Sequence, residues 1–158
     1  MFSLIEGTKV IKAISASTGT NAAMVGDYIN MENMHKVWAL INWDGGDTSP
    51  DVTFKLASDY AGTGSSTAAT AKWWINTGST VNERFALSTS TSYIKKADLG
   101  VATTRYTIIG MFDPASAAST NTHVCIHLGA RNGCVAASYI CEPRYAGYQQ
   151  FIATTSST

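Results

Sequence analysis

The feature that most constrains the fold is a short alternation of apolar and polar residues, which recurs along the chain between clusters of Gly, Pro, Asp, Asn and Ser. A period of two puts the apolar residues on one face of a strand, so each such segment is typical of a half-buried strand. Residues 52–57 show the pattern most clearly, because Val52, Phe54 and Leu56 alternate with less apolar neighbours. No segment keeps the period of an amphipathic helix. The chain is therefore predicted to be all-β.

Roughly eight to ten strands at short spacing predict an antiparallel two-sheet sandwich, jelly-roll-like in its arrangement. The most apolar run, residues 35–42, is expected to be a central strand covered on both sides, since both of its faces are apolar. Near the C-terminus, residues 122–128 and 135–141 flank a glycine-bracketed loop that contains Asn-Gly, which predicts a β-hairpin. The other expected strands cover residues 9–15, 25–29, 52–57, 71–76, 81–87, 92–97 and 105–112.

At 158 residues the chain has the length of one domain. We expect the sandwich to occupy residues 9–147, preceded by an N-terminal arm, 1–8, and followed by a C-terminal tail, 148–158. Charged residues make up 14% of the chain, against about 25% in an average globular protein. Eleven basic and eleven acidic residues give a formal net charge of zero. This balance excludes a basic nucleic-acid binder and favours association with other subunits.

The sequence also predicts where the protein is made and the state of its thiols. The first residues lack the basic start and apolar run of a signal peptide, and no stretch approaches the roughly 18 apolar residues of a membrane span. Three cysteines, Cys125, Cys134 and Cys141, are an odd number crowded into the last third, which is a poor disulfide framework. We therefore expect a soluble protein that is made in the cytoplasm, keeps its thiols reduced and has no membrane partner.

Three potential metal ligands, His123, Cys125 and His127, alternate within one predicted strand. Alternate residues of a strand project from the same face, a spacing that metal-binding jelly rolls use. The alternative is that the apolar residues between them, Val124 and Ile126, face the core and the other three line the opposite face. No acidic fourth ligand stands out nearby, and Cys134 is the only further candidate. We predict neither a metal site nor a cofactor, and these residues remain the candidates for a metal-dependent jelly-roll enzyme.

Two adjacent tryptophans, Trp73 and Trp74, lie in another predicted strand. Adjacent strand residues face opposite ways, so at least one of the two indoles is expected at the surface. An exposed indole is a preferred anchor of protein interfaces and also stacks on sugars, for which Trp43 is a further candidate. A large aromatic residue on a sheet is most often packed in the core. All three alternatives stay open from the residues alone.

Other patterns of catalysis or ion binding are not found in the sequence. There is neither a nucleophile elbow nor a phosphate-binding loop. Asp44, Asp47 and Asp51 flank a Gly-Gly turn, but their spacing does not match a calcium-binding loop. We therefore predict a protein without enzymatic activity.

Four stretches of the chain carry a resemblance to a known family. They are Lys9-Val10-Ile11, Met34-His35-Lys36-Val37-Trp38, residues 57–64 (Ala-Ser-Asp-Tyr-Ala-Gly-Thr-Gly) and residues 141–146 (Cys-Glu-Pro-Arg-Tyr-Ala). In this succession the chain resembles, from Lys9 to Tyr148, the small head proteins of tailed bacteriophages known as decoration or capsid cement proteins. It departs from that family at residues 106–110, where the family carries a more acidic strand.

The resemblance implies a β-sandwich that binds the outer surface of the capsid shell and stabilises contacts between major capsid subunits. The implied partners are the major capsid protein and other copies of the chain, and the implied location is the capsid surface of the virion. Terminal segments are favoured docking arms, so we expect partners to order residues 1–8 and 144–152. An alternative function is a receptor- or carbohydrate-binding module of a phage fibre or tail.

Five aromatic or basic residues are predicted to contact protein partners: Trp73, Trp74, Arg144, Tyr145 and Tyr148. Arg144 and Tyr145 follow the last strand at a proline, where a planar cation and an amphipathic ring suit an interface anchor. The alternative for Tyr145 is that it caps the edge of the sandwich.

Overall fold

The computed structural model describes residues 8–44, 51–67, 70–76, 85–88, 91–94 and 105–144. Within these ranges it has ten strands and one short 3-10 helix, which confirms the predicted all-β class. The elements are β1 (Lys9–Val25), β2 (Ile29–Asn30), β3 (Met34–Asp44), β4 (Val52–Ala57), β5 (Ser66–Thr67), β6 (Lys72–Asn76), β7 (Ala86–Leu87), β8 (Tyr93–Ile94), β9 (Arg105–Phe112), η1 (Pro114–Ser116) and β10 (His123–Pro143). No helix in these ranges has the length and apolar character needed to cross a bilayer.

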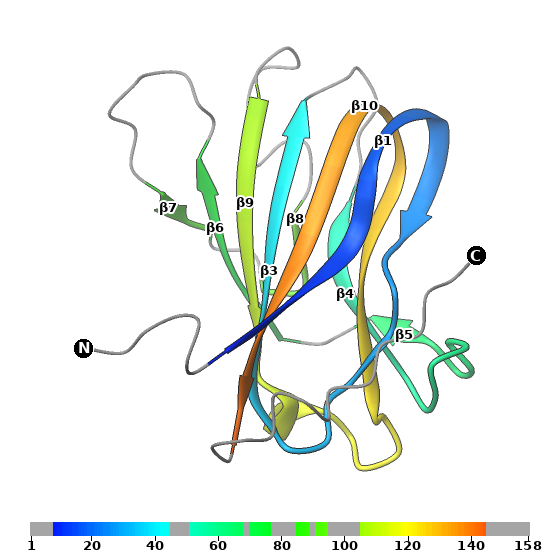
Figure 1. Cartoon of the computed structure of the whole chain (residues 1–158), viewed down its shortest axis with the longest axis vertical. Helices are drawn as coiled ribbons and strands as arrows, with labels where there is room; N and C mark the ends of the chain where they lie inside the picture. The colour runs from blue at the N-terminus through cyan, green and yellow to red at the C-terminus, as the bar shows by residue number, and fades with distance from the viewer. Residues whose placement is uncertain are drawn as a thin grey trace.

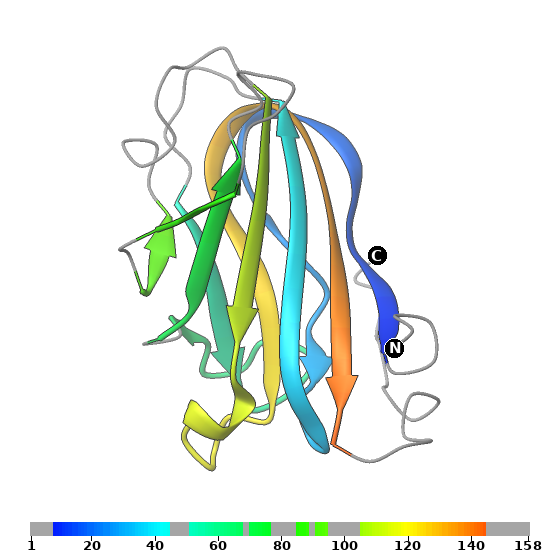
Figure 2. The ribbon, with the colours of Figure 1, turned by 90° about the vertical axis from the view of Figure 1, so that its left-hand side faces the viewer.

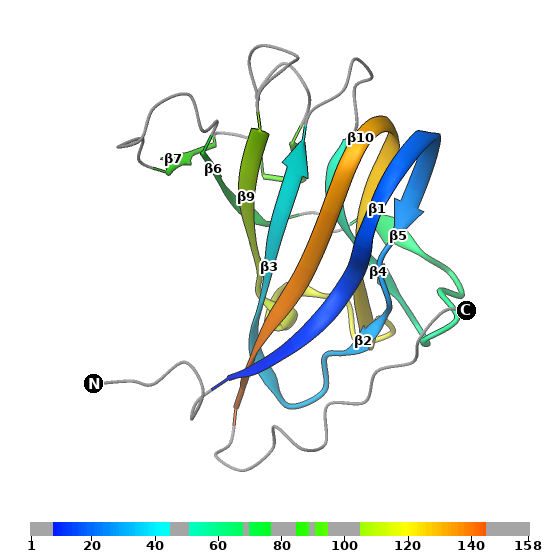
Figure 3. The same cartoon turned by 45° about the horizontal axis from the view of Figure 1, so that its top comes forward.

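Two antiparallel sheets form the predicted sandwich, and β1 and β10 take part in both (Figure 1). Sheet I consists, in order, of the first part of β1, the second part of β10, β3, β9, β6 and β7 (Figure 2). In sheet II the first part of β10 has β4 on one edge and the end of β1 and then β2 on the other. The short strands β5 and β8 pair with β4 and complete sheet II, of which β2, β4 and β5 are labelled in Figure 3.

The long strand β10 turns near its middle from sheet II into sheet I. Its residues 123–128 pair with β4, its residues 135–143 pair with β3, and β1 follows its other edge through the turn. Gly133 in the turn has φ 106°, a conformation that glycine adopts without steric cost. Register shifts typical of β-bulges let β1 bend alongside. The predicted hairpin is therefore wrong, because the two segments have other partners on both edges and do not pair with each other.

A cluster of aromatic side chains fills the space between the sheets. Phe54 of sheet II contacts Trp73 and Phe112 of sheet I, with ring centroids 5.1 Å and 5.7 Å apart. All three side chains are almost completely buried. Gly110 leaves room for this cluster, since a Cβ there would lie 2.5 Å from the Trp73 ring and 2.9 Å from the Phe54 ring.

The strand β3 lies at the centre of sheet I, between β10 and β9, as its apolar sequence predicted. Its inward residues Val37, Ala39 and Ile41 are fully buried. On its outer face Trp38 and Leu40 are only half-buried. The expected cover on both sides is therefore wrong, because sheet II packs against the inner face alone.

The predicted domain begins at Lys9, where β1 begins, and the last described strand ends at Pro143. The predicted boundary at residue 147, residues 1–7 of the arm and the whole tail, 148–158, lie outside the described residues.

Candidate functional site

The outer face of sheet I carries a continuous group of apolar side chains, aligned in two rows by cross-strand pairing. The first row lies on β1, β10, β3 and β9 and consists of Val10, Ile140, Trp38 and Met111. The second row lies on β3, β9, β6 and β7 and consists of Leu40, Ile109, Trp74 and Leu87. We call these eight residues the apolar belt. Six of them are half-buried, and the two at its ends, Val10 and Leu87, are 60% and 62% exposed.

Two indoles stack at the centre of the apolar belt. The ring centroids of Trp38 and Trp74 are 5.8 Å apart and the ring planes are inclined by 29°. The two residues come from β3 and β6, which lie on either side of β9, so the rings meet over that strand. A pair of stacked indoles offers a large and rigid apolar surface at a low cost in side-chain entropy.

Lysines extend both rows of the apolar belt, one lysine at one end of each row. Lys72 follows Met111 in the first row. In the second row Lys12 and Ser138 precede Leu40. Lys12 and Lys72 are both exposed. Each row of the belt therefore has a positive charge at one of its ends.

Polar residues border the apolar belt along its two long sides. On one side Lys36 of β3 faces Glu142 of β10 as a cross-strand pair. On the other side the hydroxyl of Thr107 donates a hydrogen bond of 3.1 Å to Oδ1 of Asn42. The belt is thus a bounded apolar surface.

The predicted interface residues Trp73 and Trp74 lie on opposite faces of β6, as their adjacency requires. Trp74 belongs to the apolar belt, whereas Trp73 is fully buried between the sheets. Trp73 is therefore a core residue, and its prediction as a surface contact is wrong. Sequence reasoning missed Trp38, because the second apolar face of its strand was interpreted as buried.

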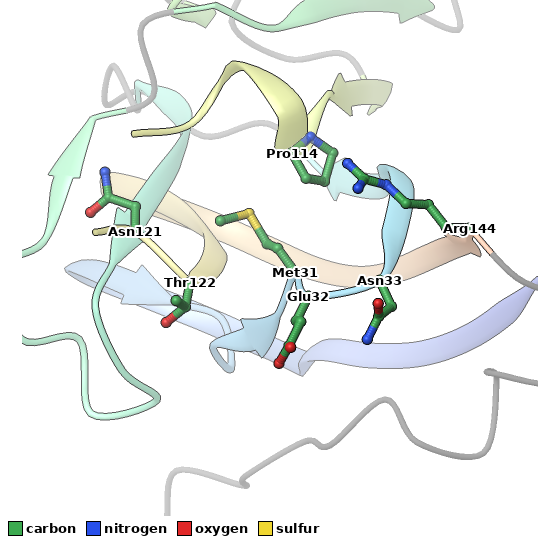
Figure 4. A pocket seen from close by; sticks show the side chains of 7 residues that line it. All are labelled: Met31, Glu32, Asn33, Pro114, Asn121, Thr122 and Arg144. Atoms are coloured by element: carbon green, nitrogen blue, oxygen red, sulfur yellow. The ribbon is translucent and has the colours of Figure 1, made fainter. Parts of the chain in front are cut away.

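Arg144 follows β10 directly, is exposed, and lines a pocket of about 370 Å³ at one end of the sandwich. Its backbone N–H donates to the carbonyl of Asn33 at 2.7 Å, and Asn33 has a positive φ of 62° in the turn before β3. In Figure 4 the Arg144 side chain extends toward Pro114, while Glu32 points away from it. The other predicted anchors, Tyr145 and Tyr148, lie outside the described residues.

The three potential metal ligands lie on the outer face of sheet II, opposite the core. Val124, Ile126 and Leu128 between and beside them are fully buried in the hydrophobic core, which is the arrangement of the alternative interpretation. Along the part of the chain that the structure describes, no group of three or more His, Cys, Asp and Glu side chains could hold a metal ion.

The environment of Cys125 differs from that of a metal-binding thiol. The Tyr28 hydroxyl is hydrogen-bonded to the Cys125 thiol, and burial raises the pKa of Cys125 from 9.0 to about 11. His123 Nδ1 lies 2.8 Å from the Thr122 hydroxyl. Partial burial lowers the pKa of both His123 and His127, and the charge of Lys55 lowers that of His127 further. The thiol is therefore protonated at neutral pH and covered by a tyrosine.

All three cysteines are free, with Cys125 and Cys141 buried and Cys134 exposed. Burial raises the pKa of Cys141 from 9.0 to about 12. A buried thiol with a raised pKa is a poor nucleophile, since the thiolate is the reactive form. These two cysteines are thus packed as small apolar side chains.

No family model matches the chain, and no curated protein matches it. Among solved structures the chain is similar to the SPBc2 prophage-derived protein YomS, with 16% sequence identity and a TM-score of 0.48. The similarity covers 85% of this chain and 91% of that one. A likeness this distant carries no argument about function.

Proposed function

We propose that the chain is a structural subunit of a bacteriophage virion without enzymatic activity, a decoration or cement protein. In this role it binds the outer surface of the capsid shell and stabilises contacts between major capsid subunits. The proposal joins the sequence resemblance to one structural observation, the apolar belt on the outer face of sheet I.

The apolar belt supports a role in protein association. Contiguous apolar surface that is bordered by polar residues is typical of protein interaction sites. Tryptophan is enriched among the residues that dominate interface energies, and such residues cluster near the centre of the contact. The stacked Trp38 and Trp74 occupy that position in the belt.

The ends of the domain support the predicted docking arms. Lys9 at the start of β1 is the cross-strand partner of Cys141 near the end of β10, so the chain enters and leaves the sandwich on adjacent strands. The first row of the apolar belt, with Val10 and Ile140, lies next to that pair. Arms that start from one corner can act together on one partner, and many copies on a shell add avidity.

The remaining elements of the proposal follow from the role. The partners are the major capsid protein and other copies of the chain, with neither nucleic acid nor a membrane. The protein is made in the host cytoplasm and resides on the capsid surface, and it needs no cofactor.

The test is to compare virus particles made with and without this chain. We expect cryo-electron microscopy to show added density outside the major capsid subunits only when the chain is present. Purified protein added to particles that lack it should co-sediment with them and raise the temperature at which the shells open. Shells that neither bind the chain nor differ in heat resistance would refute the proposal.

A second candidate is a receptor- or carbohydrate-binding module of a phage fibre or tail. The half-buried pair Trp38 and Trp74 favours it, because the face of an indole is also a platform for a sugar ring. Binding to a glycan array that is lost in Trp74→Ala, without binding to shells, would select this candidate over the first.

A further inference from the structure

We infer that the apolar belt binds an elongated apolar ridge flanked by carboxylates on the capsid shell, and not the same belt of a second copy. This inference rests on the proposed function and adds the face that docks and the chemistry of its partner. It is argued from the shape of the belt, the charges on its border and the symmetry that a second copy would impose.

The shape of the apolar belt is long and narrow. It crosses six strands, from β1 to β7, which corresponds to about 24 Å at the usual strand spacing. Its two rows lie two residues apart along the strands, or about 7 Å. The rows are staggered, since the first ends on β9 and the second begins on β3. A complementary surface is therefore an extended ridge and not a single side chain that fills a pocket.

The charges on the border of the belt are mostly positive. Lys12 and Lys72 extend its two rows, and Lys36 lies along one side. The acids beside them are Glu142, which faces Lys36 directly, and the exposed Asp113, which follows the last residue of β9. Of the charged residues that the structure describes on this border, more are positive than negative, although the chain as a whole has a formal net charge of zero. A partner with carboxylates around its apolar centre would meet these lysines with complementary charge.

A second copy does not provide that complement. A two-fold contact uses the same patch on both subunits. Belt against belt would bring together Lys12, Lys36 and Lys72 of both copies. Like charges across an interface oppose association and favour a different partner. Contacts between copies on the shell are therefore expected to use other surfaces.

The experiment measures binding of the full chain to shells from particles that lack it, by co-sedimentation at low and at high salt. Val10→Asp places a carboxylate at one end of the belt. Val25→Asp is the matched control, because Val25 is a similarly exposed valine, 50% against 60%, at the other end of β1 in sheet II. We expect Val10→Asp to weaken binding about tenfold or more and Val25→Asp by less than about twofold.

The charge of the border is tested separately. Lys12→Gln with Lys72→Gln removes two positive charges from exposed positions, so folding should be retained. The control with the same change in net charge is Ala118→Glu with Ser119→Glu, in an exposed turn after η1. We expect the double lysine variant to bind shells about threefold to tenfold more weakly than wild type at low salt, and its binding to depend less on salt. The control variant should bind almost as wild type does.

The outcomes separate this inference from the proposed function. If wild-type chain binds shells and both valine variants bind equally well, the belt is not the docking face, while the proposed function stands. If the double variant Lys12→Gln with Lys72→Gln binds as wild type does, the inference that the partner carries carboxylates is wrong. A wild-type dimer in sedimentation equilibrium that Val10→Asp dissociates would assign the belt to a second copy. Shells that do not bind wild type would overturn the inference and the proposed function together.

Discussion

The hydroxyl of Tyr139 accepts a hydrogen bond of 2.8 Å from the backbone N–H of Ile126, although the two residues lie in different sheets of the sandwich. Both belong to β10, on either side of its turn. The same hydroxyl donates to the carbonyl of Asp27 at 3.1 Å, in the segment between β1 and β2. One buried side chain therefore satisfies backbone groups at a position where strand pairing in sheet II is interrupted.

Tyr139→Phe is expected to lower the free energy of unfolding by about 1–3 kcal/mol, because it leaves a buried N–H and a carbonyl without this partner. Urea denaturation measures the change. Tyr60→Phe is the control, since Tyr60 is 62% exposed, and it should change the free energy by less than about 0.5 kcal/mol. Equal midpoints for Tyr139→Phe and wild type would contradict the assigned role.

Gly110→Ala is expected to cost about 1–3 kcal/mol of stability, because overpacking a filled core forces its side chains to move. The added methyl group would meet the rings of Trp73 and Phe54. The loss should be smaller when Trp73→Phe is also present, since the smaller ring removes the closest contact. A double-mutant cycle by chemical denaturation measures this coupling, and strictly additive effects would argue against the contact.

Substitutions of the two adjacent tryptophans are expected to separate stability from binding. Trp73→Ala removes a fully buried ring and should cost about 3–5 kcal/mol. Trp74→Ala removes a half-buried ring from the apolar belt and should cost about 1 kcal/mol, mainly through the lost stacking on Trp38. Thermal unfolding and shell binding are measured on both proteins. A stable Trp73→Ala protein, or full shell binding by Trp74→Ala, would contradict the assignment.

Stability is expected to fall at alkaline pH through the buried thiols. Burial raises the pKa of Cys125 from 9.0 to about 11 and that of Cys141 from 9.0 to about 12 in the folded protein. The unfolded chain therefore releases these protons first as the pH rises, and the free energy of unfolding decreases between pH 9 and 12. Below pH 9 the contribution is fully present.

Denaturation at a series of pH values measures this decrease. The double variant Cys125→Ala and Cys141→Ala should show a shallower decrease than wild type. Cys134→Ala is the control, because this thiol is exposed. A decrease that is equally steep in the double variant would mean that other groups cause it.

The strand faces could be predicted from the sequence, because alternation directly reports which residues share a side. Val124 and Ile126 lie in the core and their neighbours on the outside, as one of the two interpretations required. What alternation does not report is whether a second layer covers an apolar outer face. Alternation therefore predicts a buried position for Trp38, whereas its side chain is half-buried on the outer face of sheet I.

The pairing of strands could be predicted less well, because it depends on contacts distant in sequence. The glycine-bracketed loop with Asn-Gly before Val135 has the composition of a hairpin turn. In the structure β1 pairs with β10 through this region, so β10 bends from one sheet into the other and does not fold back on itself. The apolar belt could not be predicted either, because it also depends on how strands distant in sequence pair. Trp38 and Trp74 become neighbours only when the registers of β3, β9 and β6 are known.

The shared strands β1 and β10 have a consequence for how the protein folds during synthesis. Residues near the two ends of the chain pair with each other, and β10 supplies an inner strand to both sheets. Neither sheet can be completed until the last third of the chain has left the ribosome. Folding is expected to be slow for a domain of this size, because its pairings are non-local. Until β10 pairs with them, the apolar strands β3 and β4 are exposed and prone to aggregation.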